Sequence, residues 1–324
     1  MAELEMKDIF IGVDFGGTRI KLGLVFQGNI IADANIEAAS ERTFAQRLAD
    51  IALEMNNLLS QGAYRLIGIG FAFPGIVNFH TGRILSKYVK YPGAENVDLN
   101  AWAKENFGVA IAVENDARAA LIGEWKHGAG AECQDLVLVT LGTGVGTGVL
   151  VNGAPLRGKN FVGGNLGGHS TINFEGSICN CGNIGCVESE SSTWALTQIA
   201  KESPEFVTSR LSAVDIIDFK NLFELAGNGD ALAIKLQERC LKVWGLCVIN
   251  LVHAYDPDKV IFGGGIIKSS HIILPYIKEM LDKHSWISSA DVDMVVAAQP
   301  EHAGILGVYE LLKQKNTDNA FELR

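Results

Sequence analysis

Two glycine-rich stretches of this chain follow one pattern, and this repeat limits the possible folds more than any other feature. The first, IFIGVDFGGTRIKLGLVFQGNIIADANI, begins at Ile9, and the second, LVLVTLGTGVGTGVLVNGAPLRG, begins at Leu136. Each has an apolar run, a turn of glycine and threonine, a second apolar run and a polar turn, which is the pattern of a β-hairpin with a long first turn. The repeat predicts two halves of similar architecture.

Strands and helices alternate along the rest of the chain. Buried strands are expected in RLIGIGFAFPG, VAIAVEN, KVIFGGGI and DVDMVVAAQ. Helical spacing of apolar residues predicts helices over 40–62, from Asp116, over 230–255 and from about Ala303. The sequence therefore predicts an α/β protein with two lobes that meet at a cleft.

Composition narrows the class of protein. The chain has 324 residues, of which 48% are hydrophobic and 20% charged, so it is long enough for two domains. It lacks an apolar run of about eighteen residues, and its first residues lack the apolar core of a signal peptide. We therefore expect a soluble, cytoplasmic protein without a membrane partner. A net charge of −10 argues against a nucleic-acid partner, because binding to phosphates needs surplus lysine and arginine.

Cysteines cluster in the segment HSTINFEGSICNCGNIGCVE, residues 169–188. Disulfides are uncommon in a reducing cytoplasm, whereas three thiols with one imidazole form a known structural zinc set. That set would be His169, Cys179, Cys181 and Cys186. The alternative is three loop cysteines beside an unrelated histidine.

The second glycine turn, GTGVGTG at residues 142–148, does not fit a dinucleotide fingerprint. That fingerprint needs a helix directly after the glycines, and here the strand-like VLVNG follows. Backbone N–H groups and threonine hydroxyls could instead hold phosphate, although a glycine-rich hairpin can also bind nothing. Its pairing with the turn at residues 14–18 favours a polyphosphate between the two, with Asp14 holding a metal ion through water.

Asp116 follows directly after an apolar strand in VENDARAAL. It could be the N-cap of the next helix, or a general base at the carboxyl end of a strand, where ligands of α/β proteins bind. The stretch itself leaves both interpretations open. Asn115 beside it offers donors and acceptors for hydroxyl groups.

Taken together, these elements resemble the ROK family of bacterial sugar kinases and sugar-responsive repressors. The matching motifs are Asp14-Phe-Gly-Gly-Thr18, Phe73-Pro-Gly75, Glu114-Asn-Asp116, Leu141-Gly-Thr-Gly-Val-Gly146, His169 and Cys179-Asn-Cys-Gly-Asn-Ile-Gly-Cys186-Val-Glu188. The resemblance implies the α/β fold of actin, hexokinase and the Hsp70 chaperone, in which two ribonuclease-H-like lobes close over ATP at a central cleft. A small lobe would span residues 1–116, completed by a C-terminal helix at 303–324. A large lobe would span 117–302 and carry the zinc loop 169–188.

The resemblance also implies roles for individual residues. Asp116 would be the catalytic base that accepts the proton of the sugar hydroxyl, and the cofactors would be ATP, Mg²⁺ and a structural Zn²⁺. The sugar would contact Gly75, Asn115, Asp116, Asn165, His169 and Glu188. The nucleotide would contact Asp14 through its metal ion, Gly16, Gly17, Thr18, Gly142, Thr143 and Gly144 through its phosphates, and Gly264 and Gly265 near the adenosine. Zinc would be bound by His169, Cys179, Cys181 and Cys186.

Two departures from the family pattern affect the predicted sugar site. ROK kinases usually carry Gly-Glu-apolar-Gly-His before the zinc loop, whereas this chain has the longer run Gly164-Asn-Leu-Gly-Gly-His169, with Asn165 in place of the acid. Lys90 stands where many members have an asparagine. A glucose-like hexose is the expected substrate, and an N-acetylhexosamine such as N-acetylmannosamine or N-acetylglucosamine is the alternative.

The rival of another class is a non-catalytic, sugar-sensing regulator. Repressors of this family place a DNA-binding domain before the first hairpin, and only eight residues precede the first strand here, so none is expected. A placed base such as Asp116 favours an enzyme over a sensor. The partners would be a small-molecule sugar and further copies of the chain, as a homodimer or homotetramer.

Overall fold

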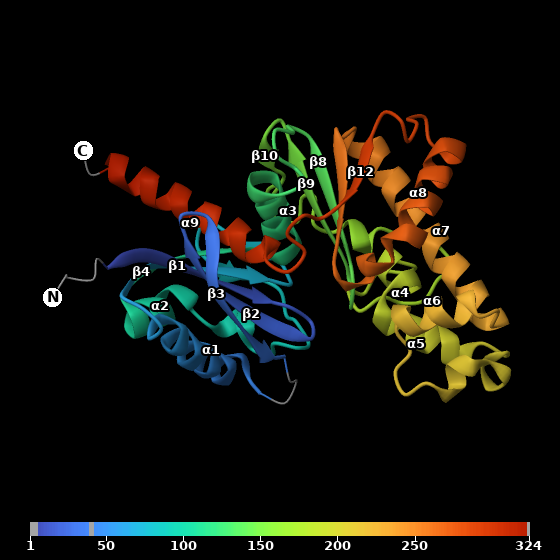
Figure 1. The fold of residues 1–324 in the computed structure, drawn as a ribbon, viewed down its shortest axis with the longest axis horizontal. Coiled ribbons are helices and arrows are strands. Elements are labelled where there is room, and N and C mark those ends of the chain that lie inside the picture. The colour runs from blue at the N-terminus through green and yellow to red at the C-terminus, as the bar shows by residue number, and fades with distance from the viewer. Residues whose placement is uncertain (1–5, 39–41, 323–324) are drawn as a thin grey trace. The chain divides into compact units, whose positions relative to one another are not determined.

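A computed structural model of the chain describes residues 6–38 and 42–322, with side chains described up to residue 315 (Figure 1). The chain divides into two compact units. The first consists of residues 1–132, 157–163 and 298–324, and the second of residues 133–156 and 164–297.

The first unit contains a five-stranded sheet in the order β3-β2-β1-β4-β7. The strand β1 runs antiparallel to β2 and parallel to β4, β2 is antiparallel to β3, and β4 is parallel to β7. The strands are β1 (Lys7–Phe15), β2 (Arg19–Phe26), β3 (Asn29–Glu37), β4 (Tyr64–Phe73) and β7 (Ala110–Asn115), with a separate ribbon of β5 (Val77–Asn78) and β6 (Arg83–Ile84). The helices are α1 (Phe44–Leu59), η1 (Ala94–Asn96), α2 (Leu99–Phe107), α3 (Asp116–His127) and α9 (Ala303–Glu322).

Helices cover both faces of this sheet (Figure 1). Apolar residues of β1 and β4 pack with Phe44, Leu48 and Ile51 of α1 and with α2 in one buried cluster. On the opposite face, α9 packs against the sheet with Ile305 and Tyr309. The periodicity that predicted α1 is confirmed, with Thr43 as its N-cap in a capping box with Gln46. The alternative cap, Ser40, lies outside the described residues.

The second unit repeats the topology of the first. Its sheet has the order β10-β9-β8-β11-β12, in which β8 is antiparallel to β9 and parallel to β11. The strands are β8 (Leu136–Leu141), β9 (Val145–Val151), β10 (Ala154–Pro155), β11 (Lys259–Gly263) and β12 (Asp293–Val296). The helices are η2 (Gly167–His169), α4 (Val187–Ser191), α5 (Thr193–Glu202), η3 (Phe206–Thr208), η4 (Arg210–Ala213), α6 (Phe219–Gly227), α7 (Ala231–Tyr255), η5 (Gly265–Ser269) and α8 (Ser270–His284).

The two predicted hairpins are confirmed as β1–β2 and β8–β9. Even the turns that follow them match, because Gln27-Gly28 and Asn152-Gly153 all have positive φ. Two such residues in a row form a type I′ turn, whose twist suits a hairpin. The internal repeat in the sequence therefore reflects two units built around the same strand order.

The units divide at different residues from those expected for the lobes. The first unit extends to Glu132 rather than 116, because α3 packs closely along α9. At this crossing a Cβ on Gly123 would lie 2.0 Å from the carbonyl oxygen of Ala303, so the two backbones almost touch. The segment 157–163 also belongs to the first unit, a feature that sequence periodicity did not indicate.

Among the helices of residues 6–38 and 42–322, none is long and apolar enough to cross a membrane.

Candidate functional site

The junction of β7 and α3 in the first unit carries the predicted base. Asn115 is the N-cap of α3, and its Oδ1 accepts a hydrogen bond of 3.1 Å from the backbone N–H of Arg118. Asp116 is the first residue inside the helix, so the interpretation of Asp116 as the cap is wrong. Its Oδ1 instead accepts hydrogen bonds from Ala117 N (2.8 Å) and Asn115 Nδ2 (3.0 Å).

Gly75, Asn115 and Asp116, three of the residues predicted to contact the sugar, lie together. The Nδ2 of Asn115 donates to the carbonyl oxygen of Gly75 (3.1 Å) as well as to Asp116. This contact follows from the sheet, because β4 and β7 are parallel neighbours whose carboxyl ends share one edge. The edge presents an amide, a carboxylate and a backbone carbonyl, a set that can bind hydroxyl groups.

Glu114 belongs to this site, although the sequence analysis assigned it no role. Its side chain is fully buried, with Oε1 accepting from Arg118 Nη1 (2.8 Å) and Asn115 N (2.8 Å). Its Oε2 accepts from Arg157 Nε (2.9 Å). Arg118 lies only four residues after Glu114, whereas Arg157 is too distant in sequence to be found. Burial lowers the pKa of Arg118, an effect that the adjacent Glu114 opposes.

Asp14 lies near the end of β1, close enough to Asp116 for the two charges to interact. Burial, and then repulsion from Asp116, raise the pKa of Asp14 to about 7, while Lys21 acts in the opposite direction. A buried carboxyl group beside a second carboxylate is a suitable environment for a hard divalent cation such as Mg²⁺. The structure thus brings the predicted metal-binding aspartate close to the predicted base.

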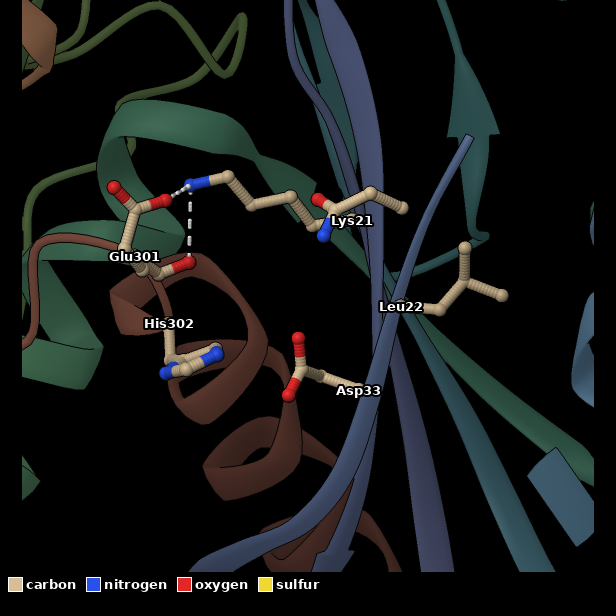
Figure 2. A pocket seen from close by; sticks show the side chains of 6 residues that line it. Lys21, Leu22, Asp33, Glu301 and His302 are labelled. Carbon is tan, nitrogen blue, oxygen red and sulfur yellow. Dashed lines mark hydrogen bonds and ion pairs between the residues drawn. The ribbon is translucent and has the colours of Figure 1, made fainter. Parts of the chain in front are cut away.

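A hollow of about 200 Å³, lined in part by Lys21, lies between β2, β3 and the segment that leads into α9 (Figure 2). The Nζ of Lys21 forms an ion pair with Glu301 Oε2 (2.8 Å) and donates to the Glu301 carbonyl oxygen (3.0 Å). Asp33 and His302 also line it, and none of its described lining residues is a predicted site residue. We therefore do not assign substrate binding to this hollow.

Two side chains donate hydrogen bonds to the backbone of the first glycine turn. Tyr91 donates from its Oη to the carbonyl oxygen of Gly16 (2.6 Å), and Lys90 donates from its Nζ to the carbonyl oxygen of Gly17. Thr18 is exposed at the turn. Lys90, which departs from the family pattern, thus places its charge at the predicted phosphate turn of the first unit.

The second glycine turn and the predicted adenosine residues meet in the second unit. Gly142 N donates to Gly144 O (3.0 Å), and Thr193 Oγ1 donates to Gly142 O (2.9 Å). Gly264 follows β11, the parallel neighbour of β8, and a Cβ on it would lie 2.3 Å from the carbonyl oxygen of Leu141. The segments 142–144 and 264–265 therefore lie at the same edge of this sheet.

Glu188 is held against the second glycine turn. Its Oε2 accepts from Val145 N (3.0 Å), and its Oε1 accepts from Trp194 Nε1 (3.3 Å). A Cβ on Gly144 would lie 2.4 Å from Oε2, so the carboxylate contacts the turn directly. A predicted sugar contact and a predicted phosphate-binding turn are therefore adjacent within one unit.

The ligand atoms of the four predicted zinc residues converge. All lie within 4.8 Å of one another in His169, Cys179, Cys181 and Cys186. Cys181 Sγ and Cys186 Sγ are 3.7 Å apart, and Cys179 Sγ is 3.7 Å from Nδ1 of His169. Ligands held tetrahedrally about 2.3 Å from zinc stand about 3.8 Å apart, so the spacing suits this ion and is far too long for a disulfide.

Asn165 is buried in the second unit, with 6% of its surface exposed. Its Oδ1 has no hydrogen-bond partner among the residues that the structure describes. Thr147 fixes the segment, because its Oγ1 donates to Gly164 O (2.8 Å) and accepts from Gly167 N (2.9 Å). A buried amide oxygen without a donor is costly, which makes Asn165 a candidate ligand contact.

Comparison with known proteins gives a consistent result. Residues 10–315 match the model of the ROK family. A glucokinase of Halalkalibacterium halodurans is 32% identical over 324 residues, covering 97% of each chain. A ROK glucokinase from Streptomyces griseus, solved with glucose and AMPPNP, is 27% identical with a TM-score of 0.76, covering 94% of this chain and 99% of its own. A candidate N-acetylmannosamine kinase from Listeria monocytogenes is 26% identical with a TM-score of 0.79, covering 95% and 99%.

Proposed function

Because this chain belongs to the ROK family and is an ATP-dependent sugar kinase of the actin-like ATPase fold, we propose that it phosphorylates a hexose hydroxyl with Asp116 as the general base. One observation carries this proposal. Asn115 caps α3, and the Asp116 carboxylate lies beside it at the carboxyl end of β7.

The contacts of Asp116 suit a base. A sugar hydroxyl is a weak nucleophile, and phosphoryl transfer needs one carboxylate to accept its proton. The hydrogen bonds from Ala117 N and Asn115 Nδ2 fix one oxygen of this carboxylate. Glu114 cannot take this role, because both of its oxygens are engaged by arginines.

The glycine turns are assigned to the phosphates of ATP. Their backbone N–H groups and the hydroxyl groups of Thr18 and Thr143 offer donors, and Lys90 adds a positive charge at Gly17. Asp14 would hold Mg²⁺, whose charge neutralises the phosphates during transfer. Its proximity to Asp116 supports this role, since a cation relieves the repulsion between the two carboxylates.

Zinc is assigned to His169, Cys179, Cys181 and Cys186. Four protein ligands leave no open position, so the ion would be structural and would fix the loop before Glu188. Nδ1 of His169 faces Cys179, which leaves Nε2 on the opposite side of the ring for a sugar hydroxyl.

Glucose or a similar hexose is the first choice of substrate. The Oδ1 of Asn165 would accept a hydrogen bond from a sugar hydroxyl, or from the N–H of an acetamido group. The second possibility keeps an N-acetylhexosamine as the alternative, which the similarity to the Listeria protein also favours.

The deciding experiment measures ADP release with ATP, Mg²⁺ and a panel of glucose, mannose, N-acetylglucosamine and N-acetylmannosamine. We expect sugar-dependent ADP release that saturates with at least one of them. Sugar binding by calorimetry without any ADP release would contradict the proposal and favour a sugar sensor.

A further inference from the structure

The segment 157–163, which we call the strap, belongs to the first unit although the chain before and after it belongs to the second. One buried side chain holds its backbone. Arg118 Nη2 donates to the carbonyl oxygens of Phe161 (3.2 Å) and Gly163 (2.8 Å), while Nη1 donates to Glu114 Oε1 (2.8 Å). Arg118 is fully buried, so these hydrogen bonds from a charged donor are shielded from water.

Glu114 also binds Arg157, the first residue of the strap. Arg157 contacts Glu114 Oε2 with both Nε (2.9 Å) and Nη2 (2.8 Å). The guanidinium of Arg157 also lies over the ring of Phe79, 4.1 Å from its centroid. Two guanidinium groups therefore share one buried carboxylate, which ties both ends of the strap to β7.

Phe161, in the middle of the strap, has a left-handed backbone conformation with φ of 62°. This conformation is unfavourable for a residue with a side chain, and it persists only where the surroundings hold it. Arg118 holds the carbonyl group of Phe161. The ring centroid of Phe161 lies 6.1 Å from that of Phe79 and 6.1 Å from that of His80. Strain of this kind concentrates at ligand clamps.

The strap meets both segments that carry the proposed sugar contacts of the first unit. Phe79 and His80 closely follow Gly75, and Glu114 directly precedes Asn115, whose N–H it accepts. We propose that the strap forms one wall of the acceptor-sugar site and that Arg118 and Glu114 are the positioning residues that fix it. This inference rests on the proposed function, which it extends beyond the residues that contact the sugar.

The test replaces Arg118 with lysine. Arg118→Lys keeps the charge, but a single ammonium group cannot reproduce the planar fork that reaches Glu114, Phe161 and Gly163 together. We expect the KM for the sugar to rise about 10- to 100-fold, the range for lost hydrogen bonds to a charged group. The KM for ATP should stay within about twofold. Trypsin should also cleave faster after the exposed Lys159 of the loosened strap.

Two further variants keep the test decisive if Arg118→Lys folds poorly. Arg157→Lys changes a more accessible partner of Glu114 and should give a smaller rise in sugar KM with the same selectivity. Arg83→Lys alters a solvent-exposed ion pair with Asp98 in the same unit, and should change neither the two KM values nor cleavage after Lys159.

The outcomes separate this inference from the function on which it rests. If the parent protein turns over sugar but the strap variants raise both KM values equally, or neither, the strap has only a structural role and the inference is wrong. If the parent phosphorylates no sugar, the proposed function fails, and the sugar wall fails with it.

Discussion

At the scale of single residues, Asp116 allows a sharp test because its amide variant keeps its shape. Asp116→Asn preserves the side-chain oxygen that accepts from Ala117 N but cannot take a proton. Loss of a general base typically costs about 10²–10⁴-fold, so we expect kcat to fall by about that factor. Sugar affinity should change much less. Steady-state kinetics and sugar calorimetry measure the two effects separately.

Asp98→Asn is the matched control for Asp116→Asn. Asp98 is a true N-cap, since its side chain accepts from Asn100 N and Ala101 N at the start of α2. Asparagine caps about as well as aspartate, so both stability and kcat should stay close to the parent values. An Asp116→Asn enzyme that retained turnover within about threefold would rule out the base.

The pKa of Asp14 predicts how stability depends on pH. Its pKa of about 7 in the folded protein exceeds the ordinary value near 3.8, so the folded state holds this proton more tightly. Ionisation of Asp14 therefore destabilises the fold as pH rises through this window, and the cost is fully present above pH 7. Without added Mg²⁺, Asp14→Asn should raise Tm relative to the parent at pH 8 and much less at pH 4. A difference in Tm that is independent of pH would contradict the shift.

Residue roles were predictable where neighbours in sequence carry the signal. Asp14 lies near the end of an apolar strand and Asp116 directly follows one, so their position at the carboxyl ends of strands could be predicted from the sequence. The sequence could not decide between cap and base for Asp116, because that depends on the rotamer of Asn115. Arg157 could not be assigned at all, since its partner Glu114 is distant in sequence.

At the scale of elements, the turn after β11 tests the predicted nucleotide edge. Gly264 has φ of 85°, and a Cβ on it would lie 2.3 Å from the carbonyl oxygen of Leu141. Gly264→Ala should lower the free energy of unfolding by about 1–3 kcal/mol and raise the KM for ATP more than that for sugar. Urea denaturation and kinetics measure these effects.

Gly265→Ala is the control one residue further along. No described atom lies within 4 Å of a Cβ built on Gly265, and its φ is not positive. We expect a stability change of less than about 0.5 kcal/mol. Equal effects at both positions would mean that the conformation of Gly264 is not what matters.

The metal-binding loop gives a second prediction for an element. Purified protein should contain one equivalent of zinc per chain, measured by elemental analysis. Cys181→Ser should reduce this content and weaken sugar binding more than ATP binding, because the loop leads to Glu188. Cys133→Ser, which lies outside the cluster, should leave the zinc content unchanged. A folded and active parent with well under one equivalent would exclude the site.

Regular elements were predictable to the extent that their periodicity is local. The hairpins, α1, α3 and α7 follow from apolar spacing and turn residues. The short helices between residues 187 and 213 have no such repeat, since they are fixed by contacts such as that of Thr193 with Gly142. The strap has no periodicity either, because Arg118 determines its conformation.

At the scale of the whole molecule, the repeat predicted two units with one strand order, and both sheets have that order. The boundaries could not be predicted in the same way. The boundaries depend on the packing of α3 along α9 and on the contacts of Glu114 and Arg118 with the strap. Both sets of contacts join residues more than 40 positions apart. A repeated pattern therefore specifies the sheets, while long-range contacts decide to which unit the connecting segments belong.

Substrate choice is a property of the whole molecule, because turnover measures it only in the complete protein. Asn165 is buried, and its Oδ1 lacks a described donor. In Asn165→Glu, a carboxylate would accept stronger, charge-assisted hydrogen bonds from the hydroxyl groups of glucose. We expect kcat/KM for glucose to rise relative to N-acetylmannosamine and N-acetylglucosamine.

Asn106→Glu controls for the added charge, because Asn106 is exposed on α2. Asn106→Glu should leave the ratio of kcat/KM for glucose to kcat/KM for the N-acetylhexosamines unchanged. Asn165→Glu should shift this ratio even if burial of the new charge lowers kcat/KM for every sugar. The ratio is the informative quantity, because a loss of folded protein scales all substrates equally and cancels. A ratio that stays constant, or moves toward the N-acetylhexosamines, would mean that Asn165 does not determine specificity and that the strap and Glu188 are the next residues to vary.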